Sequence, residues 1–101
     1  MIKISISKEN GLISKVEING HSGYDVSGKD IVCASVSSIV ITSVNAIIRM
    51  NENSITYKKD EGYVEVIVKE HSKEIDILLD NMISLLKELE QSYGKFIKVY
   101  E

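Results

Sequence analysis

The sequence predicts an α+β fold: a two-layer sandwich in the order ββαββαβ, with two helices packed on one face of a mixed sheet. Three observations predict it. Apolar and polar residues alternate at the start, two longer segments carry apolar residues at helical spacing, and shorter alternating segments follow each of these. The 101 residues contain no proline and no linker, which indicates a single domain over 1–101.

The first two predicted strands form a hairpin. Isoleucine alternates with lysine or serine over residues 2–7, which is typical of a strand with one buried face. Asn10-Gly11 is a strong hairpin turn signal, and residues 12–19 form the second strand. Residues 20–29 then contain three glycines and few apolar groups. A loop of this kind inside a small domain is usually functional.

Residues 30–51 predict a long helix, although their many valines and isoleucines favour a strand. Polar residues spaced by three or four form one narrow stripe: Ser35, Ser38, Thr42, Asn45 and Arg49. Most of this helix is therefore expected to be buried. Four residues are expected to face the sheet: Val36, Val40, Val44 and Ile47. Ile41 and Ile48 lie off that line, which predicts a homodimer.

The start of this helix leaves two alternatives. Asp30 is a good N-cap, and the helix would then begin directly after it. Ser27 with Asp30 also fits a capping box, which would start the helix earlier.

The second half of the chain predicts a hairpin, a helix and a last strand. Residues 54–58 and 63–69 form the hairpin strands, with a tight turn at 60–62. Ser72 caps a strongly amphipathic helix, and Gly94 follows its end. Seven apolar residues share one face of this helix: Ile75, Leu78, Leu79, Met82, Leu85, Leu86 and Leu89. Residues 96–100 form the final strand.

Composition excludes several classes of protein. Fifteen acidic and twelve basic residues give a net charge of -3, which argues against direct nucleic-acid binding. One cysteine excludes an internal disulfide and a zinc finger. The alternating N-terminus is not a signal peptide. Six of the residues 31–48 are Ser, Thr or Asn, so no membrane span is expected, and a cytoplasmic protein is predicted.

The segment 20–37 carries the candidate chemistry, because it holds His21 and the single cysteine, Cys33. With Asp30 as N-cap, Cys33 is the third helical residue, where free N–H groups and the helix dipole favour a thiolate. If the loop returns the chain to the sheet, His21 reaches the sulfur. A Cys–His pair suffices for acyl transfer, and N–H groups at the helix start would hold the oxyanion.

Simpler explanations stand beside this hypothesis. Cys33 points to the apolar side of the helix, and free cysteine is among the most buried residue types, so it fits a core residue. The chain would then be a non-catalytic module that binds the ribosome or a ribosomal protein, and a redox-sensing thiol is an intermediate version. A zinc site would need His21, Cys33, His71 and a carboxylate, and no close ligand pair supports it. We therefore expect no metal and no other cofactor.

One motif resembles a known family. Gly20-His21, then Gly28-Lys29-Asp30-Ile31-Val32-Cys33-Ala34, then Val36-Ser37 is similar to the pattern of the ribosomal-processing cysteine proteases, the Prp family. Chain length and element order also suit that family. Ser22 departs from the pattern, because alanine is most common at that position.

The resemblance implies a specific activity. The family removes a short N-terminal extension from a bacterial large-subunit ribosomal protein, number twenty-seven, and its members are cytoplasmic homodimers that need no metal. By resemblance, Cys33 is the nucleophile and His21 the general base and acid. Four residues would support the site or bind substrate: Gly20, Gly28, Asp30 and Ser37. The peptide substrate would be the ribosomal protein precursor, with the loop 22–27 closing over it.

Overall fold

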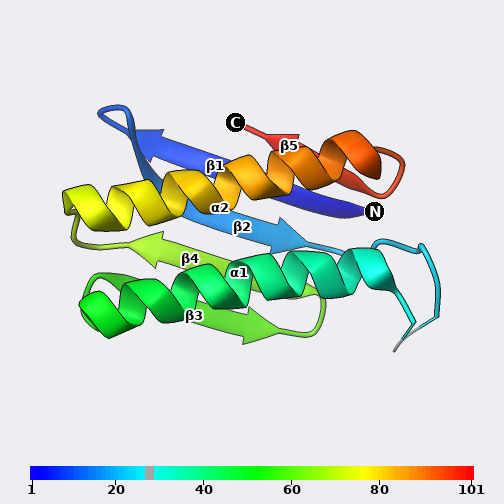
Figure 1. Ribbon diagram of the computed structural model, residues 1–101, viewed down its shortest axis with the longest axis horizontal. Coiled ribbons are helices and arrows are strands. Elements are labelled where there is room, and N and C mark those ends of the chain that lie inside the picture. Colours follow the sequence, from blue (N-terminus) through cyan, green and yellow to red (C-terminus); the bar gives the residue numbers. More distant parts are fainter. Residues whose placement is uncertain (27–28) are drawn as a thin grey trace.

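The computed structural model describes residues 1–26 and 29–101 and has the order ββαββαβ (Figure 1). Its elements are β1 (Ile2–Glu9), β2 (Leu12–Asn19), α1 (Ile31–Met50), β3 (Ile55–Asp60), β4 (Tyr63–Val68), α2 (Lys73–Ser92) and β5 (Ile97–Tyr100). This order confirms the predicted element order. It could be predicted because the spacing of apolar residues along each segment indicates a strand or a helix.

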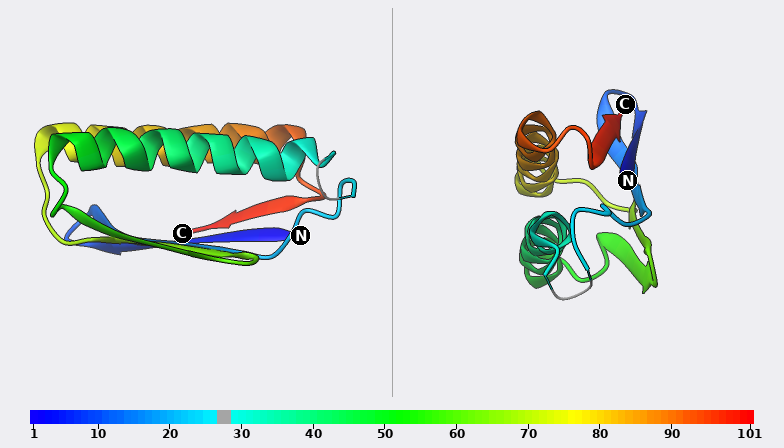
Figure 2. Two further views of the ribbon diagram at one scale, coloured as in Figure 1. Left: turned by 90° about the horizontal axis from the view of Figure 1, so that it is seen from below. Right: turned by 90° about the vertical axis from the view of Figure 1, so that its right-hand side faces the viewer.

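The five strands form one mixed sheet in the order β3-β4-β2-β1-β5. Hairpin partners and the β2–β4 pair are antiparallel, whereas β5 runs parallel to β1 at one edge. Both helices lie on the same face of the sheet, in a second layer (Figure 2). The predicted two-layer sandwich with a mixed sheet is therefore confirmed.

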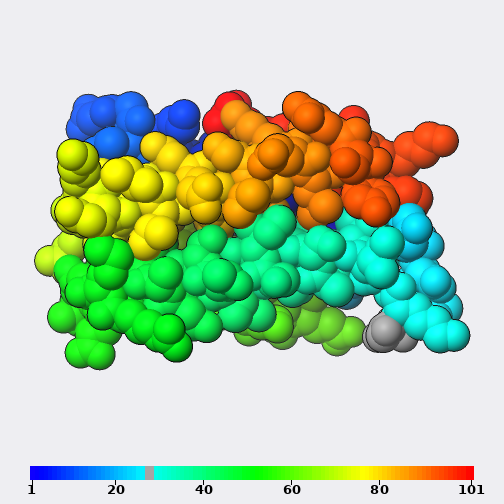
Figure 3. Space-filling model, viewed as in Figure 1, coloured from blue at the N-terminus to red at the C-terminus, as the bar shows by residue number. Residues whose placement is uncertain are grey.

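The core lies between the helices and the sheet. Alternation along the strands points apolar residues into it, interrupted between Ile13 and Val16 where the β1–β2 register shifts: Ile2, Ile4, Ile6, Ile13, Val16, Ile18, Ile55, Val66 and Ile97. From α2, the buried apolar residues are Ile75, Leu79, Met82, Ile83 and Leu86. α1 and α2 lie side by side over this layer and cover the face seen in Figure 3. All these side chains form one hydrophobic cluster, which fixes the helices on the sheet.

Burial of α1 differs from the prediction. The four residues expected to face the sheet are buried, and so are Val32 and Ser43. The rest of the helix is partly or fully exposed, so the expectation that most of it is buried is wrong within one chain. The sheet covers one side of α1 and α2 a second side, which leaves Ile41 40% and Ile48 37% exposed. By length and composition α1 is apolar enough to cross a membrane, a property it shares with core helices that pack on a sheet.

The helix starts follow the predicted caps. Asp30 is the N-cap of α1 and accepts hydrogen bonds from the N–H groups of Val32 and Cys33. The earlier start that a capping box would give is therefore wrong, and Ser27 itself lies outside the described residues. Ser72 accepts the Ile75 N–H at 3.2 Å at the start of α2.

The β3–β4 hairpin is shifted slightly from its predicted bounds. β3 begins at Ile55, because the Ser54 hydroxyl donates to the Asn51 carbonyl and holds this residue in the preceding turn. β3 extends to Asp60, so the turn contains Glu61 and Gly62. At the other end of α2, Gly94 follows the C-cap Tyr93, as predicted.

Two leucines that are neighbours in α2 test this packing. Leu86 is fully buried, whereas Leu85 is 38% exposed. We expect Leu86→Ala to lower the free energy of unfolding by about 2–5 kcal/mol, because it leaves a cavity in the core. The control Leu85→Ala should cost less than about 1 kcal/mol. Urea unfolding followed by circular dichroism measures both, and equal losses would contradict the orientation of α2.

Candidate active site

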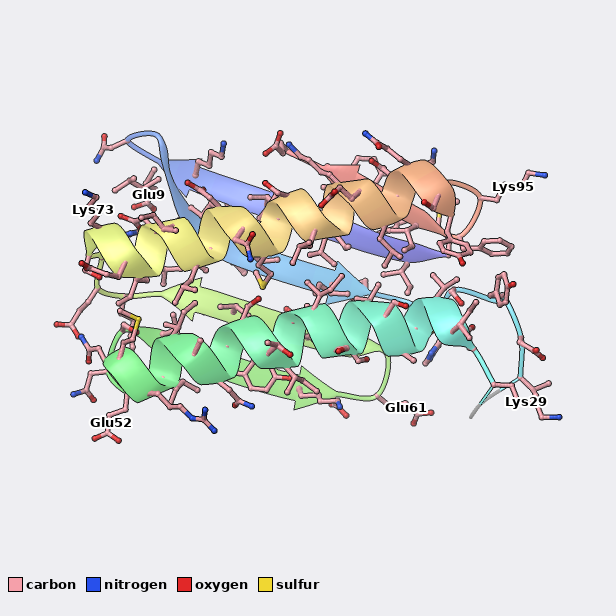
Figure 4. The ribbon with its side chains drawn as sticks, in the orientation of Figure 1. Glu9, Lys29, Glu52, Glu61, Lys73 and Lys95 are labelled. Atoms are coloured by element: carbon pink, nitrogen blue, oxygen red, sulfur yellow. The ribbon has the colours of Figure 1, made fainter. Side chains whose placement is uncertain are left out.

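The two candidate catalytic residues lie at one end of the molecule. His21 comes two residues after the end of β2, and Cys33 lies in the first turn of α1. Figure 4 marks this end by Lys29 in the loop and Glu61 in the β3–β4 turn, with Glu9 and Glu52 at the opposite end. The loop between β2 and α1 carries the chain from the sheet layer up to the helix layer, so the two residues approach the same region from different layers.

Ser22 attaches the start of this loop to the helix. It is only 4% exposed, and its hydroxyl donates to Oδ2 of Asp30. Its backbone N–H donates to Sγ of Cys33 at 3.4 Å, and its Oγ accepts the Tyr24 N–H at 3.1 Å. The residue that departs from the family pattern therefore makes hydrogen bonds that alanine could not make through its side chain.

Asp30 is the most heavily hydrogen-bonded carboxylate of the site. Oδ1 accepts the Val32 and Cys33 N–H groups at 3.0 and 2.9 Å, and Oδ2 accepts the Ser22 hydroxyl and the Asp25 N–H. Partial burial raises the pKa of Asp30. The hydrogen bonds, first that from Ser22, lower it by more than burial raises it, so the pKa is about 2. Asp30 is therefore ionised at neutral pH.

The same cap changes one expectation. Because Asp30 accepts the Val32 and Cys33 N–H groups, these two donors are not free to hold an oxyanion, and the oxyanion site at the helix start stays a prediction. Among the described residues, the N–H that points at the Cys33 sulfur is the one of Ser22.

The His21 imidazole lies on the other side of the site, against the β3–β4 turn. A Cβ atom placed on Gly62 would lie 3.0 Å from Nε2 of His21, so the ring packs on the bare glycine. His21 is exposed, and Cys33 is partly buried. Within the described chain no hydrogen bond joins the imidazole to the Cys33 thiol, in keeping with a resting site whose two groups are separate.

Two cavities open beside these residues. His21, Cys33 and Ser37 line both of them. The first has a volume of about 160 Å³, and its lining includes apolar side chains of α1, β3 and β4: Val36, Val40, Ile41, Tyr57 and Val64. The second, of about 510 Å³, is lined in part by the carboxylates Asp25, Asp30 and Glu61. The thiol and the imidazole therefore lie between an apolar cavity and an acidic one.

The four predicted supporting residues have different places. The backbone at Gly20 has a φ of +93°, and a side chain there would collide with the Met1 carbonyl, so only glycine fits. Asp30 and Ser37 lie in the site as described. Gly28 lies outside the described residues, and its role stays a prediction.

Two contacts of the site are not predicted by the sequence. Tyr24 packs edge-on against Tyr93 and Phe96, and its ring centroid lies 5.8 and 5.2 Å from theirs. The loop is therefore anchored by aromatic packing at the C-terminal end of α2. Gly62, directly before β4, contacts His21, which follows the neighbouring strand β2. Neither partner could be read from local spacing, because both lie more than forty residues away in the chain.

His71 does not join the site. Its Nδ1 atom lies 2.7 Å from Oδ1 of Asp76 near the start of α2. Over residues 1–26 and 29–101, no three or more His, Cys, Asp or Glu side chains gather closely enough to hold a metal ion.

Comparisons with known proteins agree with this arrangement. Residues 1–98 match the family model of the cysteine protease Prp. The chain is 31% identical to the ribosomal processing cysteine protease Prp of Bacillus subtilis, covering 98% of this chain and 96% of that one. It is 30% identical to the protein of the same name from Staphylococcus aureus, covering 98% and 97%.

The fold agrees as well. A crystal structure of the essential ribosomal processing protease Prp from S. aureus, in complex with a covalently linked product peptide, superimposes with a TM-score of 0.92. The two chains are 28% identical, and the match covers 99% of this chain and 98% of that one. With the family model matching nearly the whole chain, the motif around His21 and Cys33 has its explanation: the chain belongs to the cysteine protease Prp family.

Proposed function

We propose that this protein removes the N-terminal extension of bacterial large-subunit ribosomal protein number twenty-seven, with Cys33 as nucleophile and His21 as general base and acid. One observation carries the proposal. The Cys33 sulfur accepts the Ser22 N–H and lines the same two cavities as the His21 imidazole. The relatives named as ribosomal processing proteases, and the covalently linked product peptide of the S. aureus structure, support the reaction and the substrate class.

The chemistry follows from a thiol and an imidazole acting in turn. His21 takes the Cys33 proton, and the sulfur attacks the peptide carbonyl carbon, whose π electrons move to oxygen. When the C–N bond breaks, His21 returns the proton to the leaving amine, which leaves a thioester on Cys33. His21 then takes a proton from water, the hydroxide oxygen attacks the thioester, and the released thiolate recovers the proton.

The lack of a hydrogen bond between His21 and Cys33 among the described residues fits this scheme. Catalytic hydrogen bonds are often long in free enzymes and shorten only when substrate is bound. A peptide that enters between the two cavities would exclude water from the imidazole and the sulfur. The bond between the two groups would then form in the complex.

The lining of the cavities supports a peptide as substrate. The first cavity offers apolar walls for a side chain of the peptide, and Ser37 lies between the two cavities. The carboxylates of the second cavity and the net charge of -3 favour a basic partner such as a ribosomal protein.

The alternative is a non-catalytic module with Cys33 in the core. The partial burial of Cys33, its hydrogen bond from Ser22 and its place in the wall of both cavities favour the nucleophile instead. A core thiol would be enclosed by apolar side chains.

We also propose that residues 1–101 act as one protease domain, and that it works in the cytoplasm as a homodimer. The outer side of α1 supports the dimer. Ile41 and Ile48, seven residues apart and so on one side of this helix, are both exposed. A second copy would remove this surface from water.

Removal of either candidate catalytic group tests the reaction. We expect Cys33→Ala to fold and to lose all cleavage, because the chain has no other thiol. His21→Ala should lose at least about 100-fold in rate, the usual contribution of general acid–base catalysis. Incubation with full-length ribosomal protein number twenty-seven from the same genome, followed by mass analysis, measures both.

The second histidine supplies the control for that experiment. His71→Ala removes an imidazole far from the site and should keep wild-type cleavage. Cleavage by Cys33→Ala at the wild-type rate would contradict the assignment of the nucleophile.

The Asp30 cap gives stability a specific dependence on pH. Its folded-state pKa of about 2 lies below the ordinary aspartate pKa of 3.8, so the ionised form stabilises the fold. We expect Asp30→Ala to lower the free energy of unfolding at pH 7 by about 0.5–2 kcal/mol. This difference should be full above pH 3.8 and should shrink as the pH falls toward 2. Urea unfolding over that pH range measures the difference in free energy of unfolding. Asp30→Asn serves as a variant that keeps a capping side chain without the charge. A difference that stays constant with pH would argue against the ionised cap.

The dimer is tested by mass in solution. Light scattering at micromolar concentration should give twice the chain mass of 11.3 kDa. Ile41→Glu, which places a charge on the exposed side of α1, should give the monomer, while Asp80→Glu on the exposed side of α2 should not. A wild-type species of 11.3 kDa alone would reject the dimer.

A further inference from the structure

We propose that Gly62, in the turn between β3 and β4, is a positioning residue that sets the place of the His21 imidazole. The inference rests on the proposed role of His21 as general base and acid. Nothing in the motif around His21 and Cys33 points to this turn, which lies far away in the sequence.

The first support is the contact between the ring and the glycine. A Cβ atom on Gly62 would lie 3.0 Å from Nε2, 3.6 Å from Cε1 and 3.7 Å from Cδ2 of His21. Three ring atoms therefore pack on the side of Gly62 where any other residue carries its side chain. The ring could not keep this place beside a larger residue, since one of the two would have to move.

The second support is a main-chain bond to the same turn. The Gly62 carbonyl accepts the Gly20 N–H at 2.8 Å, directly before His21 in the chain. Gly62 therefore holds the backbone that leads into His21 and also contacts its ring. Both contacts come from one residue, so the turn restricts where the imidazole can lie relative to Cys33.

The turn itself is firmly held. Tyr63, the next residue, pairs with Asn19 of β2, and its hydroxyl oxygen lies within hydrogen-bond distance of the Glu17 and Glu65 carboxylates, at 3.0 and 2.7 Å. Gly62 and His21 also line the apolar cavity together with Cys33. The β3–β4 turn thus forms a fixed wall on one side of the candidate site, with the Cys33 helix on the other.

The chain contains a matched control for Gly62. Gly11 is also a hairpin glycine, with a φ of +80° against +66° at Gly62, but a Cβ atom on Gly11 would meet nothing within 4 Å. Its hairpin lies at the end of the molecule marked by Glu9 in Figure 4, opposite Glu61. Both glycines thus have a positive φ, and only Gly62 has an imidazole packed against it.

The experiment compares Gly62→Asn with Gly11→Asn. Asparagine tolerates the left-handed region better than other residues with a Cβ atom, so both variants should fold. Two readouts are needed. The first is the NMR spectrum of the histidine ring protons, in which His71 is an internal reference because the chain has two histidines. The second is kcat and KM for cleavage of the full-length ribosomal protein number twenty-seven.

We expect the His21 ring signals to shift in Gly62→Asn and to stay in place in Gly11→Asn, with His71 unchanged in both. For Gly62→Asn, kcat should fall about tenfold or more while KM changes less than about threefold, because misplacement of a catalytic group affects the chemical step. Gly11→Asn should stay within about twofold of wild type in both constants.

Three outcomes would overturn the inference: unshifted His21 signals, an unchanged kcat, or loss of folding in Gly62→Asn alone. Circular dichroism detects the loss of folding, which would show that Gly62 serves stability. His21→Ala, measured in parallel, separates this inference from the proposed function. Wild-type cleavage by His21→Ala would reject the role of His21 itself. An inactive His21→Ala beside a fully active Gly62→Asn would reject only the role of Gly62.

Discussion

The Asp30 carboxylate is the interaction on which the rest of the site depends. One oxygen accepts the N–H groups of Val32 and Cys33 and so fixes where α1 begins, while the other accepts the Ser22 hydroxyl. Ser22 in turn directs its N–H to the Cys33 sulfur and follows His21 directly. A single ionised side chain thus joins the helix that carries the thiol to the loop that carries the imidazole.

The sheet supplies the opposite wall. Because β2 pairs with β4, the end of β2 lies beside the start of β4, and the β3–β4 turn reaches the segment at Gly20 and His21. The loop runs from the end of β2 in the sheet layer up to α1 in the helix layer, and the β3–β4 turn belongs to the sheet layer (Figure 2). The cavities therefore open where the two layers meet, and Cys33 and His21 face them from different layers. A small fold can in this way bring the two candidate catalytic side chains to the same cavities.

Local signals predicted much of this arrangement. Apolar periods gave the element order, and the Asp30 cap and the sheet-facing residues of α1 followed from spacing along one helix. Contacts between segments far apart in the sequence were not predictable. The contacts of Tyr24 with Phe96 and of Gly62 with His21 depend on the order of the strands in the sheet. The N–H groups of Val32 and Cys33 were expected to be free, but the carboxylate that makes Asp30 a good cap accepts both of them. The narrow polar stripe of α1 led to a prediction of more burial than α1 has. One sheet face and one neighbouring helix cover only part of its apolar surface.

The rate of alkylation of Cys33 by iodoacetamide tests the central claim most directly. Cys33 is the only cysteine, so intact mass reports this one side chain, and the urea-unfolded chain supplies its own reference. If Asp30 and Ser22 hold the thiol in an accessible site, Cys33 of the folded protein should react near neutral pH faster than the same thiol in the unfolded chain. Slower reaction in the folded protein than in the unfolded chain would show a protected core thiol and contradict the account.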